Sequence, residues 1–240
     1  MMKVPNSYVF VLAAMLAVFA GTASAGPCER LASLSAANTR VTAASTVAAG
    51  GFSPPAQLGS TIGGGPSGAS IQFNHLPAFC RVTATLTPTS DSDIKIEVWM
   101  PVSDWNGKLQ SVGNGGWAGL ISYPALAVAL SGGYATASTD TGHTGNTGSF
   151  ALGHPEKYID FGYRAVHEMT IAAKAIIAAY YGKAPKFSYW NGCSSGGRQG
   201  LTEAQRYPSD YDAIIAGAPG GQPSPSSRLV VVDRSSRPQR

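Results

Sequence analysis

The chain has 240 residues, of which 44% are hydrophobic and 12% are charged. This balance excludes an intrinsically disordered chain, which is too polar to bury a core. The 29 glycines and 16 prolines predict many tight loops and exclude a coiled coil or a helical bundle. The net charge is +4, but the excess of Lys and Arg lies at Lys3 and in residues 221–240. Charge therefore gives no support for nucleic-acid binding.

Residues 1–25 have the pattern of a secretory signal peptide. Lys3 precedes an uncharged apolar run over residues 8–20, and Ala23-Ser24-Ala25 then supplies the small-x-small pattern that signal peptidase cleaves. The run is shorter than a membrane span needs, and no later segment approaches about 20 apolar residues. We therefore expect a secreted or periplasmic protein that begins near Gly26 and has no membrane partner after cleavage. An uncleaved N-terminal anchor is the alternative.

The three cysteines are Cys28, Cys80 and Cys193. Export places them in a compartment where disulfides form and persist. A bond between Cys28 and Cys80 would close a long loop at the start of the mature chain and leave Cys193 without a partner. An odd cysteine in an exported protein indicates either a reactive thiol or an absent partner.

Residues 26–80 are rich in Ala, Ser, Thr and Gly and show no sustained hydrophobic periodicity. They predict an irregular wrap on the surface of the protein. The pattern changes at residue 81, where the alternating segments 82–86 and 94–100 are joined by turn residues 89–93. These segments predict a β-hairpin with one buried face.

From residue 108 onward, predicted strands alternate with predicted helices. The strands cover residues 108–112, 134–139, 186–191 and 211–216, and the helices cover residues 124–130, 163–181 and 198–206. This alternation is typical of an α/β fold with a mostly parallel sheet and flanking helices. The Pro-, Ser- and Arg-rich residues 220–240 do not continue it. We therefore expect a partial α/β domain over residues 81–219, without its C-terminal strands, and a non-native or disordered tail over 220–240.

Gly192-Cys193-Ser194-Ser195-Gly196 matches the G-x-S-x-G pattern of a nucleophile elbow. The pattern alone is weak because Gly and Ser are abundant in this chain. Here, however, a predicted strand leads into it and a predicted helix follows. Such a turn holds a serine hydroxyl at the carboxyl end of a parallel sheet. Ser194 is therefore the candidate nucleophile, and a glycine-rich turn without chemistry is the alternative.

A glycine-rich loop over residues 113–119 follows the predicted strand 108–112. Acyl transfer needs two backbone N–H donors aimed at the developing oxyanion. One comes from the residue after the nucleophile, and the other comes from a loop that follows an earlier strand. Ser195 and either Gly115 or Gly116 are the candidate donors.

The same loop has a second interpretation. Gly113, Gly115 and Ala118 fit part of a dinucleotide-binding fingerprint, and Asp140 ends the next predicted strand where a ribose-binding acid would lie. Exported proteins rarely meet nicotinamide cofactors, and the strand before this loop is not the first of the sheet. Both points favour the oxyanion interpretation.

A serine nucleophile needs a general base, which in α/β hydrolases is a histidine that follows the serine in sequence. The four histidines, His75, His143, His154 and His167, all precede Ser194. His167 is expected on a solvated flank of its helix. His143, just after a predicted strand, is expected to have a structural role in its loop.

Four segments carry a resemblance to a known family: Gly113-Asn114-Gly115-Gly116, Ser138-Thr139-Asp140-Thr141-Gly142-His143, Asp160-Phe161-Gly162-Tyr163-Arg164-Ala165 and Gly192-Cys193-Ser194-Ser195-Gly196-Gly197-Arg198-Gln199-Gly200. With them, residues 80–219 resemble the N-terminal part of the tannase and feruloyl esterase family of α/β hydrolases. That family includes enzymes that hydrolyse mono(hydroxyethyl) terephthalate.

The resemblance implies an α/β-hydrolase fold and hydrolysis of a small phenolic or aromatic ester through an acyl-enzyme. It implies Ser194 as the nucleophile and Ser195 with Gly115 or Gly116 as oxyanion donors. It also implies that Cys193 is half of a disulfide whose other cysteine lies beside the catalytic histidine.

In the family, the catalytic Asp, the His-Cys pair and a lid with a calcium site lie beyond the matching part. We therefore expect no cofactor or metal in this chain, an unpaired Cys193 and weak or no activity. A non-catalytic exported module that binds aromatic esters is the alternative function.

Overall fold

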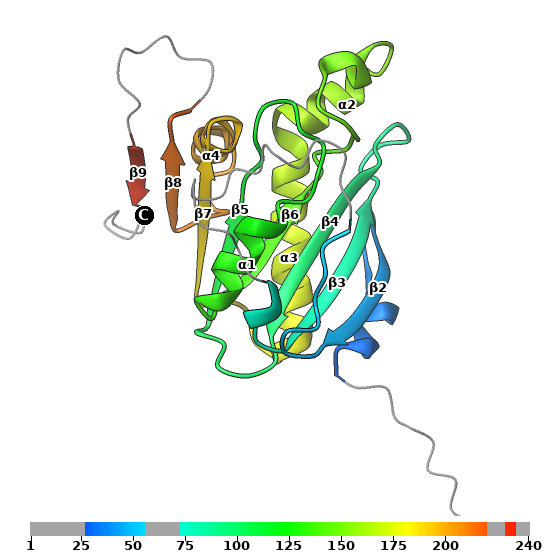
Figure 1. Ribbon diagram of the computed structural model, residues 1–240. Helices are drawn as coiled ribbons and strands as arrows, with labels where there is room; N and C mark the ends of the chain where they lie inside the picture. Colours follow the sequence, from blue (N-terminus) through cyan, green and yellow to red (C-terminus); the bar gives the residue numbers. More distant parts are fainter. Residues whose placement is uncertain (1–26, 56–72, 220–228, 234–240) are drawn as a thin grey trace, which may run out of the picture.

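The computed structural model describes residues 27–55, 73–219 and 229–233. The predicted signal peptide, residues 1–25, lies outside the described residues. Within them, a mixed sheet has the strand order β1-β2-β3-β4-β6-β5-β7-β8-β9 (Figure 1). The strands are β1 (Ser35–Ala36), β2 (Thr39–Val47), β3 (Phe79–Leu86), β4 (Ile94–Pro101), β5 (Lys108–Val112), β6 (Ala135–Thr139), β7 (Phe187–Cys193), β8 (Ala213–Gly217) and β9 (Leu229–Asp233).

Helices connect the strands of the second half of the sheet. The α-helices are α1 (Tyr123–Ser131), α2 (Pro155–Ile159), α3 (Ala165–Tyr181) and α4 (Ser195–Arg206). Shorter 3-10 helices are η1 (Glu29–Ser33), η2 (Phe73–His75) and η3 (Gly148–Ala151), and η4 (Asp160–Arg164) is a π-helical turn.

The parallel part of the sheet consists of β6, β5, β7 and β8, and antiparallel strands extend it on both sides. β5 lies between β6 and β7 although it precedes both in sequence. The connection that follows β5 therefore leads to β6 on one side of it, whereas β7 lies on the other side of β5. In open α/β sheets, a crevice forms at the carboxyl ends of two strands whose connections diverge in this way.

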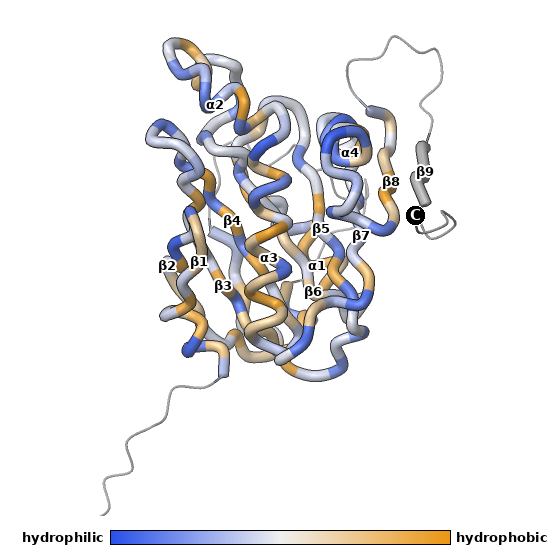
Figure 2. Tube along the Cα trace, turned by 180° about the vertical axis from the view of Figure 1, so that it is seen from behind, coloured by the Kyte–Doolittle hydropathy of each residue, from blue (hydrophilic) through white to orange (hydrophobic). Residues whose placement is uncertain are grey.

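Both faces of the sheet are covered. Side chains of β4 alternate between the faces, so Val98 and Met100 belong to the core beneath α3, whereas Trp99 belongs to the core beneath α1. Figure 1 shows α1 in front of the sheet, and Figure 2 shows α3 across the opposite face. Leu126 and Leu130 of α1 are fully buried against this second core.

The N-terminal region is more regular than expected. Within residues 26–80, β2 pairs antiparallel with β3, so the expectation of an irregular wrap is wrong for residues 39–47. The register shifts between Val41 and Ala43. This irregularity interrupts the period-2 alternation that a strand prediction depends on. The expected disulfide between Cys28 and Cys80 is present and joins the residue before η1 to β3.

The long predicted helix begins earlier than residue 163. α2, the π-helical turn η4 and α3 follow one another without a break from Pro155 to Tyr181. A π-helical turn inserts a residue into the helix and so interrupts its 3.6-residue periodicity. Gly182 ends α3 in the left-handed conformation at φ 69°, as expected of a C-terminal glycine.

The other predicted strands and helices have the observed type, with bounds that differ by three residues or fewer. Within the predicted non-native tail, residues 229–233 form β9, which pairs antiparallel with β8. This short apolar stretch is therefore a strand rather than disordered, since β-branched Val residues favour an extended conformation, and the expectation that the tail is non-native stays a prediction. The remaining residues of the tail lie outside the described residues.

Candidate active site

Ser194 occupies the turn between β7 and α4. Its backbone has φ 57° and ψ −119°, a conformation that non-glycine residues rarely adopt. Hydrogen bonds on both sides hold it: the Ser194 N–H donates to the Gly217 carbonyl at 2.9 Å, and the Arg198 N–H donates to the Ser194 carbonyl at 3.0 Å. The strained turn at Ser194 is the geometry expected of a nucleophile elbow.

Two glycines allow the turn to pack. A Cβ atom at Gly192 would lie 2.5 Å from the carbonyl carbon of Gly196. A Cβ atom at Gly113, in the loop after β5, would lie 2.5 Å from the Cα of Gly196. Neither position has room for a side chain, so at these glycines the backbones of the two facing segments lie in direct contact.

Asn114 and Gln199 connect these two segments. The Asn114 N–H donates to Oε1 of Gln199, and Nε2 of Gln199 donates to Oδ1 of Asn114, each at 3.2 Å. The side-chain Nδ2 of Asn114 also donates to the carbonyls of Leu120 and Thr139, at 2.7 and 2.8 Å. Sequence reasoning assigned no role to this buried pair, although both residues lie in segments that carried the family resemblance.

The candidate oxyanion donors lie together. Ser195 is the first residue of α4, and N–H groups in the first turn of a helix have no acceptor within it. The Ser195 hydroxyl donates to the Gly116 carbonyl at 2.8 Å, which holds the loop of residues 113–119 against the helix start. Gly116 has φ 54°, and Gly115 precedes it with its carbonyl bonded to the Ala118 N–H.

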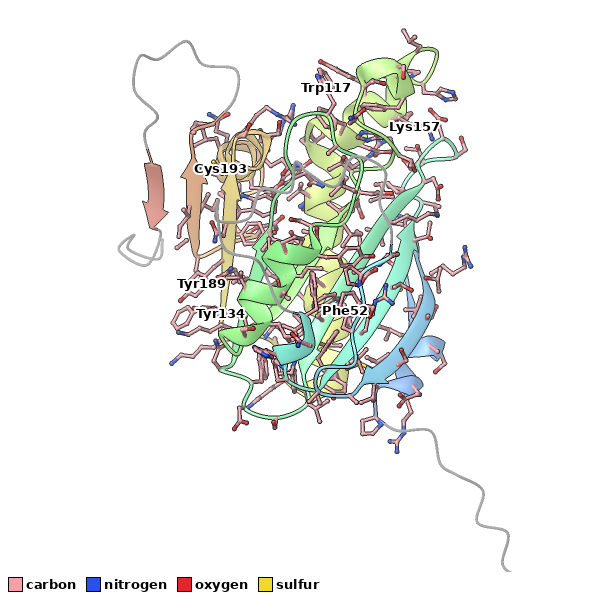
Figure 3. All side chains as sticks on the ribbon, in the orientation of Figure 1. Phe52, Trp117, Tyr134, Lys157, Tyr189 and Cys193 are labelled. Atoms are coloured by element: carbon pink, nitrogen blue, oxygen red, sulfur yellow. A yellow bond between two sulfur atoms is a disulfide. The ribbon has the colours of Figure 1, made fainter. Side chains whose placement is uncertain are left out.

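A pocket of about 440 Å³ opens beside Ser195. It is lined by Gly116, Trp117, Tyr158, Ile159, Phe161, Gly162, Tyr163, Ser195 and Arg198. Trp117 stacks on Phe161 with ring centroids 4.9 Å apart, and the Arg198 guanidinium lies over the same Phe161 ring. Figure 3 shows Trp117 and Cys193 toward the same end of the molecule, whereas Tyr189 lies toward the other end of β7. The pocket therefore lies at the carboxyl ends of the parallel strands.

His143 has a structural role in its loop. Its Nε2–H donates to the Trp117 carbonyl at 2.7 Å, and its ring stacks on Phe150 at a centroid distance of 3.7 Å. Burial lowers the pKa of His143, which favours the neutral imidazole. His143 thus holds the loop that carries Trp117 and makes no hydrogen bond to Ser194 among the described residues.

The remaining histidines are engaged elsewhere. His154 pairs with Asp91 at 2.8 Å, and His75 ends η2. His167 pairs with Asp210 at 2.6 Å and stacks on a tyrosine, with a side chain only 24% exposed. The expected solvated flank at His167 is therefore only partly exposed, because Tyr207 and Asp210 pack against the imidazole ring. No histidine of the described chain acts on Ser194.

Asp140 is bound within its own turn. Its Oδ1 accepts the N–H groups of Lys95 and Gly142, at 2.9 and 2.8 Å. Burial outweighs these bonds and raises the pKa of Asp140 to about 7. A carboxylate engaged in this way does not support the ribose-binding interpretation.

Cys193 is exposed and unpaired in the described part of the chain, directly before Ser194. None of the helices in that part is both long and apolar enough to span a membrane.

Comparisons with known proteins agree with this geometry. A family model described as tannase and feruloyl esterase matches residues 80–223. An uncharacterized esterase of Xanthomonas campestris pv. campestris is 42% identical over 210 residues, covering 87% of this chain and 34% of that protein. Feruloyl esterase B of Aspergillus niger is 38% identical over 182 residues, covering 76% of this chain and 33% of that protein.

Solved structures show the same fold. The crystal structure of feruloyl esterase B from Aspergillus oryzae matches with a TM-score of 0.68 and 35% identity, over 80% of this chain and 36% of that one. The chain thus spans about a third of the length of these relatives. The family model covers more than half of the chain, which therefore belongs to the tannase and feruloyl esterase family and has an α/β-hydrolase fold.

Proposed function

We propose that the chain carries the nucleophile, the oxyanion donors and part of the substrate pocket of an exported serine hydrolase for phenolic or aromatic esters. The observation that carries the proposal is the strained backbone of Ser194 between β7 and α4. The names of its relatives, which include feruloyl esterases, support the reaction class. The signal-peptide pattern of residues 1–25 and the Cys28–Cys80 disulfide support export.

In this proposal the Ser194 hydroxyl attacks the ester carbonyl, and the N–H groups of Ser195 and of Gly116 or Gly115 stabilise the oxyanion. Collapse of the tetrahedral intermediate expels the alcohol and leaves an acyl-enzyme on Ser194. Water then releases the acid. The proton of the Ser194 hydroxyl needs a base, and the four histidines of this chain do not supply one.

The pocket favours a planar, apolar substrate group. Trp117, which is 46% exposed, offers an aromatic face next to Ser195, and aromatic side chains bind planar rings through offset stacking. The Arg198 guanidinium, which donates to the Gly162 carbonyl at 3.0 Å, adds a polar edge to the same wall. This combination fits a phenolic ring better than an aliphatic chain.

A non-catalytic binding module is the second candidate function, since no histidine in the described part of the chain hydrogen-bonds to Ser194. The two functions are distinguished by hydrolysis of methyl ferulate in the presence and absence of imidazole, which supplies a diffusible base. The matched control is Ser194→Ala, which undergoes the same background reaction with imidazole.

Without imidazole, we expect the two proteins to be equally slow, because removal of the nucleophile costs little further once the base is missing. With imidazole, the parent chain should release ferulate faster than Ser194→Ala. Equal rates at every imidazole concentration would exclude Ser194 as a nucleophile and leave the binding module.

A further inference from the structure

A buried carboxylate without a hydrogen-bond donor lies between α3 and α4. Glu203 of α4 has 0% exposure, and neither of its carboxylate oxygens has a hydrogen-bond partner among the described residues. Asp210, in the connection between α4 and β8, is 7% exposed and contacts it. Two buried carboxylates cannot both stay ionised in contact unless a cation or a proton lies between them.

A histidine completes the group from a third segment. Nδ1 of His167, on α3, lies 2.6 Å from Oδ2 of Asp210. One ligand atom from each of His167, Glu203 and Asp210 lies within 4.8 Å of the others. The His167 ring stacks on Tyr207 at a centroid distance of 3.7 Å, which restrains its orientation. Its partial exposure gives the group an opening to solvent.

We propose that His167, Glu203 and Asp210 bind a divalent metal ion of the zinc type. One imidazole nitrogen with two carboxylates is a donor set that Zn²⁺ accepts, and solvent at the open side completes its coordination. Bonds of about 2.0–2.2 Å place ligand atoms roughly 3–4 Å apart, so side-chain shifts of about 1 Å suffice. The hydrogen bond between His167 and Asp210 opens when both become ligands.

A metal ion compensates the buried carboxylates of Glu203 and Asp210 better than a proton does. A single proton neutralises only one of the two carboxylates, whereas a divalent metal ion compensates the charge of both. A cation between the two buried carboxylates also removes their mutual repulsion.

The positive charge of Lys174 repels a cation at the proposed site, and its removal is a specific test of metal binding. Its Nζ donates to the backbone carbonyl of Asp210 at 2.5 Å, which places a positive charge next to the proposed site. Removal of that charge should tighten binding of a metal by about tenfold. If the three residues only stabilise the fold, removal of the Lys174 charge does not change metal binding.

The experiment measures Zn²⁺ binding by calorimetry and thermal unfolding on the untagged chain after treatment with EDTA. All proteins carry Cys193→Ser, since the exposed thiol would bind zinc by itself. We expect one Zn²⁺ per chain and a raised Tm, with no comparable effect of Mg²⁺, which avoids imidazole. Glu203→Gln and His167→Gln should each weaken binding at least about 100-fold, since even outer-shell partners contribute 10–100-fold.

Two further variants complete the design. Lys174→Met should bind zinc more tightly, and Glu168→Gln, on α3 outside the group, should bind like the parent. If Glu203→Gln does not fold, His167→Gln, at a side chain that is partly exposed, carries the test. The absence of saturable zinc binding by the parent would overturn the proposal and leave a proton-sharing pair. Equal binding by the parent and by His167→Gln would overturn it as well.

Discussion

The backbone N–H of Gly196 donates to the carbonyl oxygen of Asn114 at 2.8 Å. This bond joins the first turn of α4 to the loop after β5, two segments that are far apart in sequence. The Gln199 side chain makes two further bonds to Asn114. The candidate oxyanion donors on both segments are thus held by one rigid network.

Replacement of Gln199 by Leu should destabilise the protein. The change leaves the N–H and Oδ1 of Asn114 buried without partners, and each buried unsatisfied group costs roughly 1–3 kcal/mol. We expect the free energy of unfolding, measured by urea denaturation, to fall by about 3 kcal/mol. Gln205→Leu on the exposed face of the same helix is the control and should change little. Equal stability of the two variants would contradict the role of Gln199.

The Gly113→Ala variant tests the close approach of the two backbones. A new Cβ would lie 2.5 Å from the Cα of Gly196, so the β5 loop or the elbow must shift. Overpacking of this kind costs about 1–3 kcal/mol of unfolding free energy. Gly162→Ala has open space around its Cβ and should be neutral in the same urea measurement. A neutral Gly113→Ala would show that the contact relaxes without cost.

Thiol titration should find one free cysteine per chain. The Cys28–Cys80 disulfide is formed and Cys193 is unpaired, so the denatured, unreduced protein should give one thiol. Reduction should raise the number to three. Cys193→Ser is the control and should give none before reduction. Three thiols in the unreduced parent would contradict the disulfide.

Asp140 should make stability depend on pH. Its pKa is about 7 in the folded protein and ordinarily 3.8. Between these values the unfolded chain loses the proton and the folded protein keeps it, so stability falls as pH rises. From pH 4.5 to 7.5 the loss should be about 3 kcal/mol.

Asp140→Asn removes this titration and should show a correspondingly smaller loss over the same range. The exposed Asp104→Asn is the control and should follow the parent. Urea denaturation at several pH values measures all three proteins. Parallel pH profiles for the parent and Asp140→Asn would exclude a raised pKa at this carboxyl.

Several features could be predicted from the sequence because they are local. The elbow is encoded by a strand, a G-x-S-x-G turn and a helix within consecutive residues, and these patterns determine backbone conformation directly. Gly182 ends α3 for the same reason, since only glycine adopts the left-handed conformation without strain. β2 and the π-helical turn escaped prediction because an irregular register and an inserted residue interrupt the periodicity that signals a strand or a helix.

The tertiary structure alone decided the contacts between distant segments. The sequence contains Asn114 and Gln199, but only the placement of β5 beside β7 brings their amides together. Likewise, His167, Glu203 and Asp210 show no motif, and they meet because α3, α4 and the connection to β8 pack on one face of the sheet. Local patterns specify backbone geometry and burial, whereas the pairing of polar groups across the fold depends on where the crossover connections place each strand and helix.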